Sequence, residues 1–402
     1  MLPKSPTSLE PNPQTPAARD QFWIPQNTTY LCGHSLGLQP KSAASHVDQI
    51  LSTWKTSGIE GFFEGTPSWM QLGSTTKSLL APIVGAKDEE VVVMNALTVN
   101  LHLLLSHFYQ PTSERTKILI AEKAFPSDQY ACASHIRSRG LDPNQNLIRV
   151  PHAKWLETLD EHHQSIQLVL VEYPHYLTGE VYDLKAITQK AHQIGALVGG
   201  DCAHGVGNLE LKLHDWEIDF AVWCHYKFMN SGPGAIGGAF IHQNHLQKHP
   251  KGRLEGWWGN QSKTRFEMRD EMDPCATAES WQLSTPSILS LACLNASLEL
   301  FHAYGIQKVF QRREALSELL FSEMKKIDHP NLEILTPLES HRHGATLCFS
   351  MGDQTKKLFQ HFQKNKVIVD YREPGLIRVA GSPLYTTETD IQTFINTIHS
   401  FS

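Results

Sequence analysis

The sequence has little of several features that mark particular classes of protein. It holds only 7 cysteines in 402 residues, and no two of them form a CxxC pair. This argues against a disulfide framework or a zinc site built from cysteine pairs, and it predicts reduced thiols in a cytoplasmic protein. The formal net charge is only −6, so the chain lacks the basic balance typical of proteins that coat nucleic acids.

Long hydrophobic runs are also missing. The longest apolar stretches, 101–105 and 166–171, fall far short of the roughly 20 residues that a membrane span needs. The first 20 residues are rich in proline and polar side chains and lack the apolar centre of a signal peptide. We therefore expect residues 1–25 to form a flexible lead-in, and we expect neither a membrane nor a nucleic acid as partner.

Hydrophobic residues make up 41% of the chain, which is ample material for a core. Apolar runs of strand length occur at 90–94, 117–121, 167–172, 197–200 and 220–224, and helical spacing occurs at 42–55, 69–83, 97–108 and 184–194. Short apolar strands that alternate with helices predict a mostly parallel sheet covered on both faces. Residues 237–242 are expected to form a further strand that turns back.

The pattern changes after about residue 286. Two long amphipathic helices, 288–304 and 307–326, precede strand-like segments at 332–336, 345–350, 367–371 and 376–379, with helices at 356–364 and from Thr387. This order predicts a smaller α+β unit. We expect a large domain over residues 65–290 and a small domain made of residues 26–64 and 291–402.

Reactive side chains follow two of the expected strands. One strand ends at Asp201, with His204 just beyond, and the next leads into Tyr226 and Lys227, followed by the glycine-rich segment 231–234. Ligands of doubly wound sheets lie beyond the carboxyl ends of the strands. Pyridoxal phosphate needs a lysine for its aldehyde and an acid for its pyridine nitrogen, and a partly desolvated lysine can act as nucleophile and base. Taken singly, Asp201 could be a capping residue after its strand, and Lys227 could be an ordinary lysine exposed to solvent. Together they favour this cofactor.

Two segments are candidates for the rest of a cofactor site. Leu97 and Thr98 open a helix directly after a strand, where free N–H groups and the helix dipole favour a phosphate. Phe125 follows another strand, so its ring could stack on the cofactor. Each segment has a purely structural alternative. Asn95 could simply cap the helix that begins at Leu97, and Phe125 could simply belong to the core.

At this point the sequence resembles the kynureninase family, whose members are pyridoxal-phosphate enzymes of fold type I. The matching stretches run in the family's order from about residue 30 to 385: 34–40 (HSLGLQP), 94–102 (MNALTVNLH), 124–128 (AFPSD), 201–208 (DCAHGVGN), 213–219 (LHDWEID), 220–230 (FAVWCHYKFMN), 257–259 (WWG), 264–266 (TRF) and 377–385 (IRVAGSPLY). The resemblance implies the fold of PLP-dependent transferases, a mostly parallel central sheet covered by helices plus a smaller α+β domain, with pyridoxal phosphate bound by the large domain.

The resemblance also implies a role for each matching residue. Lys227 would bond to the cofactor aldehyde and then serve as the catalytic base, Asp201 would pair with the pyridine nitrogen, and Tyr226 is the candidate proton donor and shuttle. The cofactor would be held by Leu97, Thr98, Phe125, Ser127, Asp128, Glu172, Asp201, His204, Tyr226 and Lys227, and by Trp257 and Thr285 from the partner subunit. Arg378 would hold the substrate α-carboxylate, and the other residues expected at the substrate are His34, Ser35, Phe62, Phe63 and Thr285. No metal site is expected.

The reaction implied by the resemblance is hydrolysis of the Cβ–Cγ bond of L-kynurenine or 3-hydroxy-L-kynurenine. The products would be L-alanine and an anthranilate, as in the kynurenine pathway of tryptophan catabolism and NAD biosynthesis. The resemblance further implies a cytoplasmic homodimer with its active sites at the subunit interface.

The sequence departs from the family pattern around the expected substrate. His34 and Thr285 stand where asparagine is usual, Gly61-Phe62-Phe63 stands in place of a Gly-His pair, and Glu172 stands where many members have a small hydroxyl residue. Two interpretations remain open. Either His34 or Thr285 takes over the lost contacts, or the enzyme acts on a γ-keto amino acid with a different acyl group, because lost hydrogen bonds change discrimination strongly.

Two other classes of function compete with a kynureninase. The same scaffold could support an aminotransferase or a desulfurase-like lyase, and Cys275 is the candidate thiol for the latter. A non-catalytic homologue is the third possibility, but the intact Lys227 and Asp201 argue against it.

Overall fold

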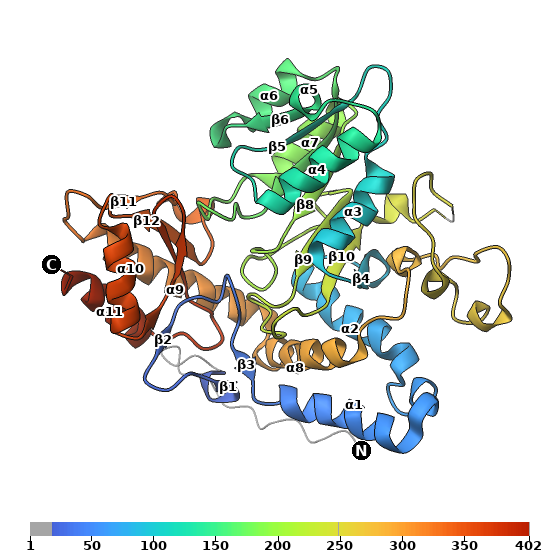
Figure 1. Ribbon diagram of the computed structural model, residues 1–402, viewed down its shortest axis with the longest axis horizontal. Helices are drawn as coiled ribbons and strands as arrows, with labels where there is room; N and C mark the ends of the chain where they lie inside the picture. Colours follow the sequence, from blue (N-terminus) through green and yellow to red (C-terminus); the bar gives the residue numbers. More distant parts are fainter. Residues whose placement is uncertain (1–17, 248, 402) are drawn as a thin grey trace.

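The computed structural model describes residues 18–247 and 249–401. Its centre is a seven-stranded sheet flanked by helices (Figure 1). In spatial order the strands are β4 (Val91–Val93), β10 (Gly237–Ile241), β9 (Phe220–Cys224), β8 (Leu197–Asp201), β7 (Ile166–Glu172), β5 (Lys117–Ala121) and β6 (Leu147–Val150). The pairs from β9 to β6 are parallel, and β10 is antiparallel to both of its neighbours. The mostly parallel sheet and the strand that turns back are thus confirmed.

Burial explains why these strands were readable from the sequence. Every residue of β9 is buried, and so are residues 168–172 of β7. A strand covered on both faces needs a continuous apolar run, which is the pattern that the sequence showed. Glycine is required at one close approach, since a Cβ on Gly199 of β8 would lie 2.2 Å from the ring of Phe220.

Helices precede or connect the strands of this sheet. They are α2 (Trp69–Val84), α3 (Leu97–Phe108), α4 (Pro126–Ser138), α5 (Pro143–Asn146), α6 (Trp155–Glu161) and α7 (Leu184–Gln193). The sequence predicted α2, α3 and α7 to within a residue or two. It did not predict α4, whose buried face consists of Asp128, Ala131, Cys132 and Ile136 and therefore has little apolar periodicity. Strand β6 and the short helices α5 and α6 were also missed.

A second, four-stranded antiparallel sheet lies to one side of the first (Figure 1). Its strands are β11 (Glu333–Ile334), β12 (Thr346–Ser350), β15 (Leu376–Ala380) and β14 (Asp370–Arg372), and helices α9 (Ile306–Lys325), α10 (Thr355–Lys364) and α11 (Glu388–His399) contribute to its core. Helix α8 (Ile288–Tyr304) packs on α2 and belongs to the core of the first sheet. The expectation of one strand over 367–371 was wrong. The chain changes sheets there, because β13 (Val367–Ile368) pairs with β2 (Thr29–Tyr30), whereas β14 pairs with β15.

The N-terminal segment packs onto both halves. Helix α1 (Ala43–Ser57) contacts α8, β1 (Phe22–Trp23) pairs with β3 (Gln39–Pro40), and Cys32 bridges to Ala380. Most of the expected lead-in, residues 1–17, lies outside the described residues. Residues 18–25 of this lead-in make contacts with the rest of the chain. These residues are ordered because Phe22 is buried and Arg19 donates a hydrogen bond of 2.7 Å to Asp390.

Two apolar clusters form the core. One surrounds the seven-stranded sheet and the other the four-stranded sheet, and the border between them falls inside α9, where Val309 belongs to the first and Leu316 to the second. The division into domains 65–290 and 26–64 with 291–402 stays a prediction. Within 18–247 and 249–401, no helix is both long enough and apolar enough to cross a membrane.

Candidate active site

A cavity lies at the carboxyl ends of β7, β8 and β9. It is lined by Leu97, Thr98, Phe125, Glu172, Pro174, Tyr176, Asp201, Ala203, His204, Tyr226 and Lys227. Asp201 and Glu172 are the last residues of adjacent parallel strands and stand opposite each other, and Lys227 follows β9 by three residues. The parallel order of the strands therefore brings together eight of the residues that the sequence placed at a cofactor.

Three buried carboxyl groups surround the one lysine of this cavity. Burial raises the pKa of Asp128, Glu172 and Asp201, and the carboxyl of Asp201 raises the pKa of the other two further. The ammonium of Lys227 opposes these shifts. Asp201 also accepts a hydrogen bond of 2.8 Å from the backbone N–H of Ala203. It is thus the carboxyl best supported as an anion, as a partner of a protonated pyridine nitrogen must be.

Two buried histidines lie beside the carboxyls, with their rings 6.1 Å apart. Burial lowers the pKa of His204 well below its ordinary value, and burial together with the charge of Arg378 lowers the pKa of His34 to about 4. Neither ring nitrogen of His34 has a hydrogen-bond partner among the described residues, and neither has Nδ1 of His204. Both imidazoles are therefore neutral near pH 7 and retain nitrogen atoms that can bind a ligand.

Tyr226 lines the cavity next to Lys227, whose Nζ lies 5.9 Å from the phenol ring. Burial raises the pKa of Tyr226 above its ordinary value, and the nearby Cys224 adds to this. The phenol therefore keeps its proton near neutral pH. In this environment Tyr226 can donate a hydrogen bond or a proton, but it is a poor base.

The first turns of two helices face the site. The N-cap of α3 is Ala96, which has no side-chain cap, and Asn95 donates instead to Asn100 Oδ1 at 3.0 Å. The first N–H groups of α3 therefore have no partner within the helix and suit a phosphate. In α4, Ser127 is half-buried and Asp128 is buried in the first turn.

Arg378 borders the cavity from β15 and is 1% exposed. Its Nη1 donates to the carbonyl of Tyr176, which lines the cavity, at 2.6 Å, and its Nη2 lies 3.4 Å from Oγ of Ser35. Its Nε donates to Oδ2 of Asp370 at 2.8 Å, and Nη2 donates to the same oxygen. The sequence analysis missed Asp370. The sequence does contain a hint of this residue, because the charged residues Asp370 and Arg372 interrupt the apolar run just before Arg378. We had interpreted this segment as the end of one apolar strand.

Nine of the expected site residues do not line this cavity. Five of them, His34, Ser35, Ser127, Asp128 and Arg378, have been placed above, and the other four are Phe62, Phe63, Trp257 and Thr285. Trp257, in the 3-10 helix η6 (Trp257–Gly259), is 40% exposed and contacts Phe266, which in turn contacts Phe63. Phe62 packs on a tryptophan of α2, and Thr285 is exposed. The loop between Trp257 and Thr285 extends away from the central sheet (Figure 1), whereas the 3-10 helix η8 (Ala278–Trp281) just before Thr285 packs on β4 and β10. Within one chain, the structure therefore separates these four residues from the other site residues.

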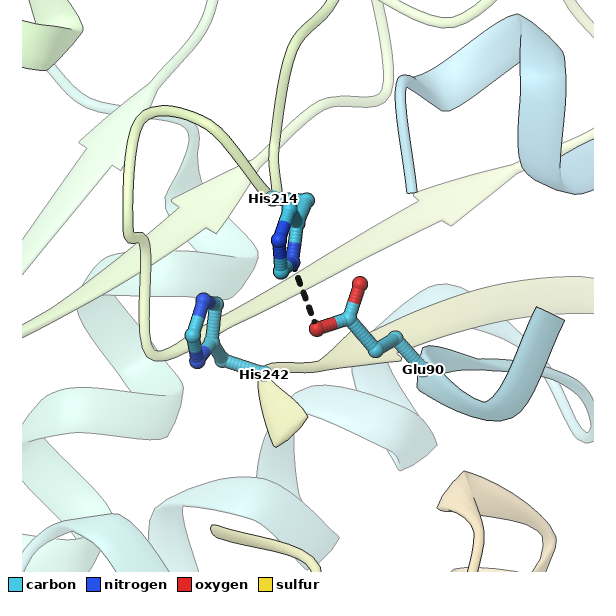
Figure 2. A group of neighbouring side chains, drawn as sticks. All are labelled: Glu90, His214 and His242. Carbon is cyan, nitrogen blue, oxygen red and sulfur yellow. Dashed lines mark hydrogen bonds and ion pairs between the residues drawn. The ribbon is translucent and has the colours of Figure 1, made fainter. Parts of the chain in front are cut away.

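A second group of polar side chains lies at the opposite end of the sheet (Figure 2). Glu90, His214 and His242 each offer a potential metal-ligand atom, and these atoms lie within 4.8 Å of one another. The Glu90 carboxylate already accepts hydrogen bonds from Nδ1 of His214 at 2.9 Å and from the N–H groups of Gln243 and Lys87 at 2.9 and 3.0 Å. We interpret the group as a hydrogen-bonded cluster, and the expectation of no metal site stays a prediction.

The fold and the cavity define a class of enzyme. The family model for class-V aminotransferases matches residues 29–370, so the chain belongs to this pyridoxal-phosphate family. Among curated relatives, the kynureninase of Koribacter versatilis is 43% identical over 391 residues, which cover 94% of this chain and 92% of that protein. The kynureninase of Christiangramia forsetii is 40% identical over 392 residues, covering 94% and 92%. The chain is thus a member of the kynureninase family, the pyridoxal-phosphate-dependent hydrolases that the sequence motifs indicated.

Solved structures agree on the fold. The cystine C-S lyase C-DES, in complex with its product cysteine persulfide, has a TM-score of 0.77 and 18% identity, covering 94% of this chain and 98% of that one. The cysteine desulfurase of Thermococcus onnurineus NA1 has a TM-score of 0.79 and 16% identity, covering 95% and 96%. These likenesses confirm the expected fold type and indicate nothing about the substrate.

Cys275 does not support the desulfurase-like alternative. It lies outside the cavity, and its thiol contacts the carbonyl oxygen of Asn260 at 3.3 Å. Burial raises the pKa of this thiol, whereas a reactive thiol needs a lowered pKa.

Proposed function

We propose that the enzyme hydrolyses L-kynurenine or 3-hydroxy-L-kynurenine at the Cβ–Cγ bond, giving L-alanine and anthranilate or 3-hydroxyanthranilate. The observation that carries the proposal is the arrangement of Lys227, Asp201 and Arg378 around one cavity. The carboxylate of such a substrate suits the guanidinium of Arg378, and its Cα proton suits the amine of Lys227 as a base. Asp201 suits the protonated pyridine nitrogen of the cofactor.

The residues present fit pyridoxal phosphate. Among the described residues, the cavity wall holds a buried polar atom without a hydrogen-bond partner, Nδ1 of His204, with both carboxyl oxygens of Asp128 beside it. Oε2 of Glu172 also lies in this wall, 3.4 Å from Nε2 of the buried His175. We propose that Asp201 holds the pyridine nitrogen, that the first turn of α3 holds the phosphate, and that Phe125 flanks the ring. When bound, the cofactor supplies an electron sink for negative charge on the substrate carbons.

Two side chains of this chain are suited to move protons. We propose that the Lys227 amine removes the proton from Cα and that the Tyr226 phenol, which burial keeps protonated, donates a proton to the alanine-side carbon. Water adds to the γ-carbonyl, its oxygen ends in the carboxylate of the anthranilate, and the Cβ–Cγ bond breaks with its electron pair on Cβ. His204 is neutral and buried beside Lys227, so it can hydrogen-bond without adding a charge to the site.

The substrate contacts follow from the same geometry. Arg378 is proposed to bind the α-carboxylate, because guanidinium N–H pairs match the two oxygens of a carboxylate. His34 is proposed to contact the aryl ketone, since it is fully buried and its Nδ1 is without a hydrogen-bond partner in the described structure, whereas its Nε2 faces the carboxylate of Asp370 at 3.7 Å. A substrate amine or hydroxyl could satisfy such a nitrogen.

We also propose a homodimer that completes each active site. The support is the exposed aromatic cluster of Phe63, Trp257 and Phe266, because adjoining exposed aromatic rings mark interaction surfaces. Trp257, Thr285, Phe62 and Phe63 would then face the partner's cavity. A cytoplasmic location is proposed from the seven free cysteines, which suit a reducing compartment.

A product assay tests the proposal. The purified, cofactor-loaded enzyme is offered L-kynurenine and 3-hydroxy-L-kynurenine in parallel, and alanine and the anthranilate are quantified. We expect equal amounts of both products from at least one substrate, and none from the Lys227→Ala variant. A cofactor absorbance that responds to amino acids without cleavage of either compound would overturn the proposed substrate and indicate a different γ-keto amino acid.

A further inference from the structure

The substrate-binding arginine is held by an anion of this chain itself. Asp370 and Arg378 are directly paired residues of the neighbouring strands β14 and β15. One carboxylate oxygen of Asp370 accepts N–H groups from both Nε and Nη2 of Arg378. The same oxygen accepts a hydrogen bond of 2.9 Å from Nε of Arg372, and Nε2 of His34 lies 3.7 Å away. Four groups on three segments of the chain therefore converge on this oxygen.

We propose that Asp370 is a positioning residue for the substrate α-carboxylate, which fixes the guanidinium of Arg378 so that a defined pair of N–H groups is left for the substrate. The inference rests on the proposed function, because it takes Arg378 as the carboxylate-binding residue. In this role Asp370 does not contact the substrate and acts only through Arg378.

The hydrogen bonds of Arg378 show which donors remain. A guanidinium has five N–H bonds. Two of them go to Asp370 and one to the carbonyl of Tyr176. One N–H on each terminal nitrogen is left over, and within residues 18–247 and 249–401 the one further hydrogen bond of Arg378 is to Oγ of Ser35, at a long 3.4 Å from Nη2. Two terminal N–H bonds are what a carboxylate needs for a bidentate contact.

The charges of the cluster lead to the same conclusion. Asp370 lies between two guanidinium groups, those of Arg372 and Arg378, so the three side chains together carry one positive charge. That charge is balanced by one substrate carboxylate. Although burial would raise the pKa of Asp370, the neighbouring His34 ring and the Arg378 guanidinium hold it well below its ordinary value. The carboxylate is thus ionised at any pH at which the enzyme works.

The opposite role is that of a competitor, in which Asp370 occupies the guanidinium and weakens substrate binding. The two roles predict opposite changes in KM. If Asp370 positions Arg378, its loss leaves a long side chain to be ordered when the substrate binds, and KM rises. We expect a rise of about thirtyfold, which corresponds to about 2 kcal/mol at about 1.4 kcal/mol per tenfold.

The test uses the holoenzyme and the Asp370→Asn and Asp370→Glu variants. Asp328→Asn, at an exposed aspartate, serves as the matched control, and Arg378→Ala tests the role of the arginine itself. For each variant, KM and kcat for L-kynurenine are measured, together with the inhibition constants of two competitive inhibitors: L-alanine and the decarboxylated amine of the substrate, which lacks the α-carboxylate. Thermal unfolding is measured alongside.

We expect Asp370→Asn to raise KM and the inhibition constant of L-alanine about thirtyfold, with kcat within about threefold and the decarboxylated amine unaffected. Asp370→Glu, which keeps the charge, should recover part of the loss. If KM is unchanged or falls, Asp370 is not a positioning residue. The same conclusion holds if the inhibition constants of both inhibitors rise equally while the melting temperature falls. If Asp370→Asn does not fold, the Asp370→Glu variant decides by the same comparison of the two inhibitors. If Arg378→Ala leaves KM unchanged, Arg378 does not bind the α-carboxylate and the proposed function of this residue is wrong. If Arg378→Ala raises KM but Asp370→Asn does not, only the inference on Asp370 is wrong.

Discussion

Replacement of Glu172 by glutamine tests whether this cavity carboxyl works in its neutral form. Oε1 of Glu172 accepts the N–H of Phe125 at 2.8 Å, whereas Oε2 has no hydrogen-bond partner among the described residues. Burial, followed by the neighbouring Asp201, raises its pKa well above the ordinary value, although the charge of Lys227 opposes this. Glutamine keeps the shape and the acceptor of a neutral Glu172. We therefore expect Glu172→Gln to retain kcat/KM within about threefold.

The same reasoning predicts how stability changes with pH in the cofactor-free protein. Between the ordinary pKa of 4.5 and the higher pKa of the folded state, the folded protein binds a proton that the unfolded chain has lost. Wild-type stability contributed by Glu172 therefore falls as the pH rises through this window. Glutamine does not titrate, so Glu172→Gln should gain stability relative to wild type over this range. The gain in unfolding free energy is about 1.4 kcal/mol for each unit by which the pKa of Glu172 in the folded protein exceeds its pKa in the unfolded chain.

Glu172→Ala is the matched comparison. It removes the acceptor of the Phe125 N–H, and a buried donor left without a partner costs about 1–3 kcal/mol. Urea unfolding of the cofactor-free proteins at pH 5 and pH 8, together with kcat/KM of the loaded enzymes, separates the cases. If glutamine loses as much activity as alanine, or if its stability relative to wild type does not increase with pH, the carboxyl is ionised and the reasoning is refuted.

Three further substitutions follow from the structure. Lys227→Ala should abolish both product formation and the visible absorbance of the bound cofactor, and a yellow, active variant would contradict the central assignment. Asp219→Asn removes a buried carboxylate that accepts hydrogen bonds from two histidine rings and a backbone N–H, so urea unfolding at pH 7 should show a loss of about 2–4 kcal/mol. Because these bonds lower the pKa of Asp219 despite its burial, the difference should shrink as the pH falls through that lowered pKa. Gly199→Ala places a Cβ 2.2 Å from the ring of Phe220 and should cost about 1–3 kcal/mol, seen as a lower melting temperature.

The strands and the core of the site were readable from the sequence for a simple reason. Strands buried on both faces must be apolar throughout, so β7, β8 and β9 appeared as short apolar runs that end at Glu172, Asp201 and just before Lys227. Parallel strands bring their carboxyl ends to one edge of the sheet. The meeting of Asp201 and Lys227 therefore followed from local pattern and topology alone.

Helix α4 and the N-terminal segment were not readable in the same way. The buried face of α4 is built from a carboxyl, a thiol and small side chains, and such a face shows no apolar period. Residues 18–25 have a polar, proline-containing context, but contacts with distant residues such as Asp390 order them. Local composition does not carry contacts of this kind.

The sequence by itself determined the family and the cofactor, and it predicted the residues proposed to carry the chemistry, because these depend on residue types at fixed positions along the chain. Only the tertiary structure decided in which direction the pKa values of the site residues shift and which side chains form hydrogen bonds with one another. The lowered pKa of His34 and the raised pKa of Glu172 depend on burial, and the contact of Asp370 with Arg378 depends on the register of β14 against β15. Burial and register are set by how distant parts of the chain pack, and no local pattern in the sequence contains that information.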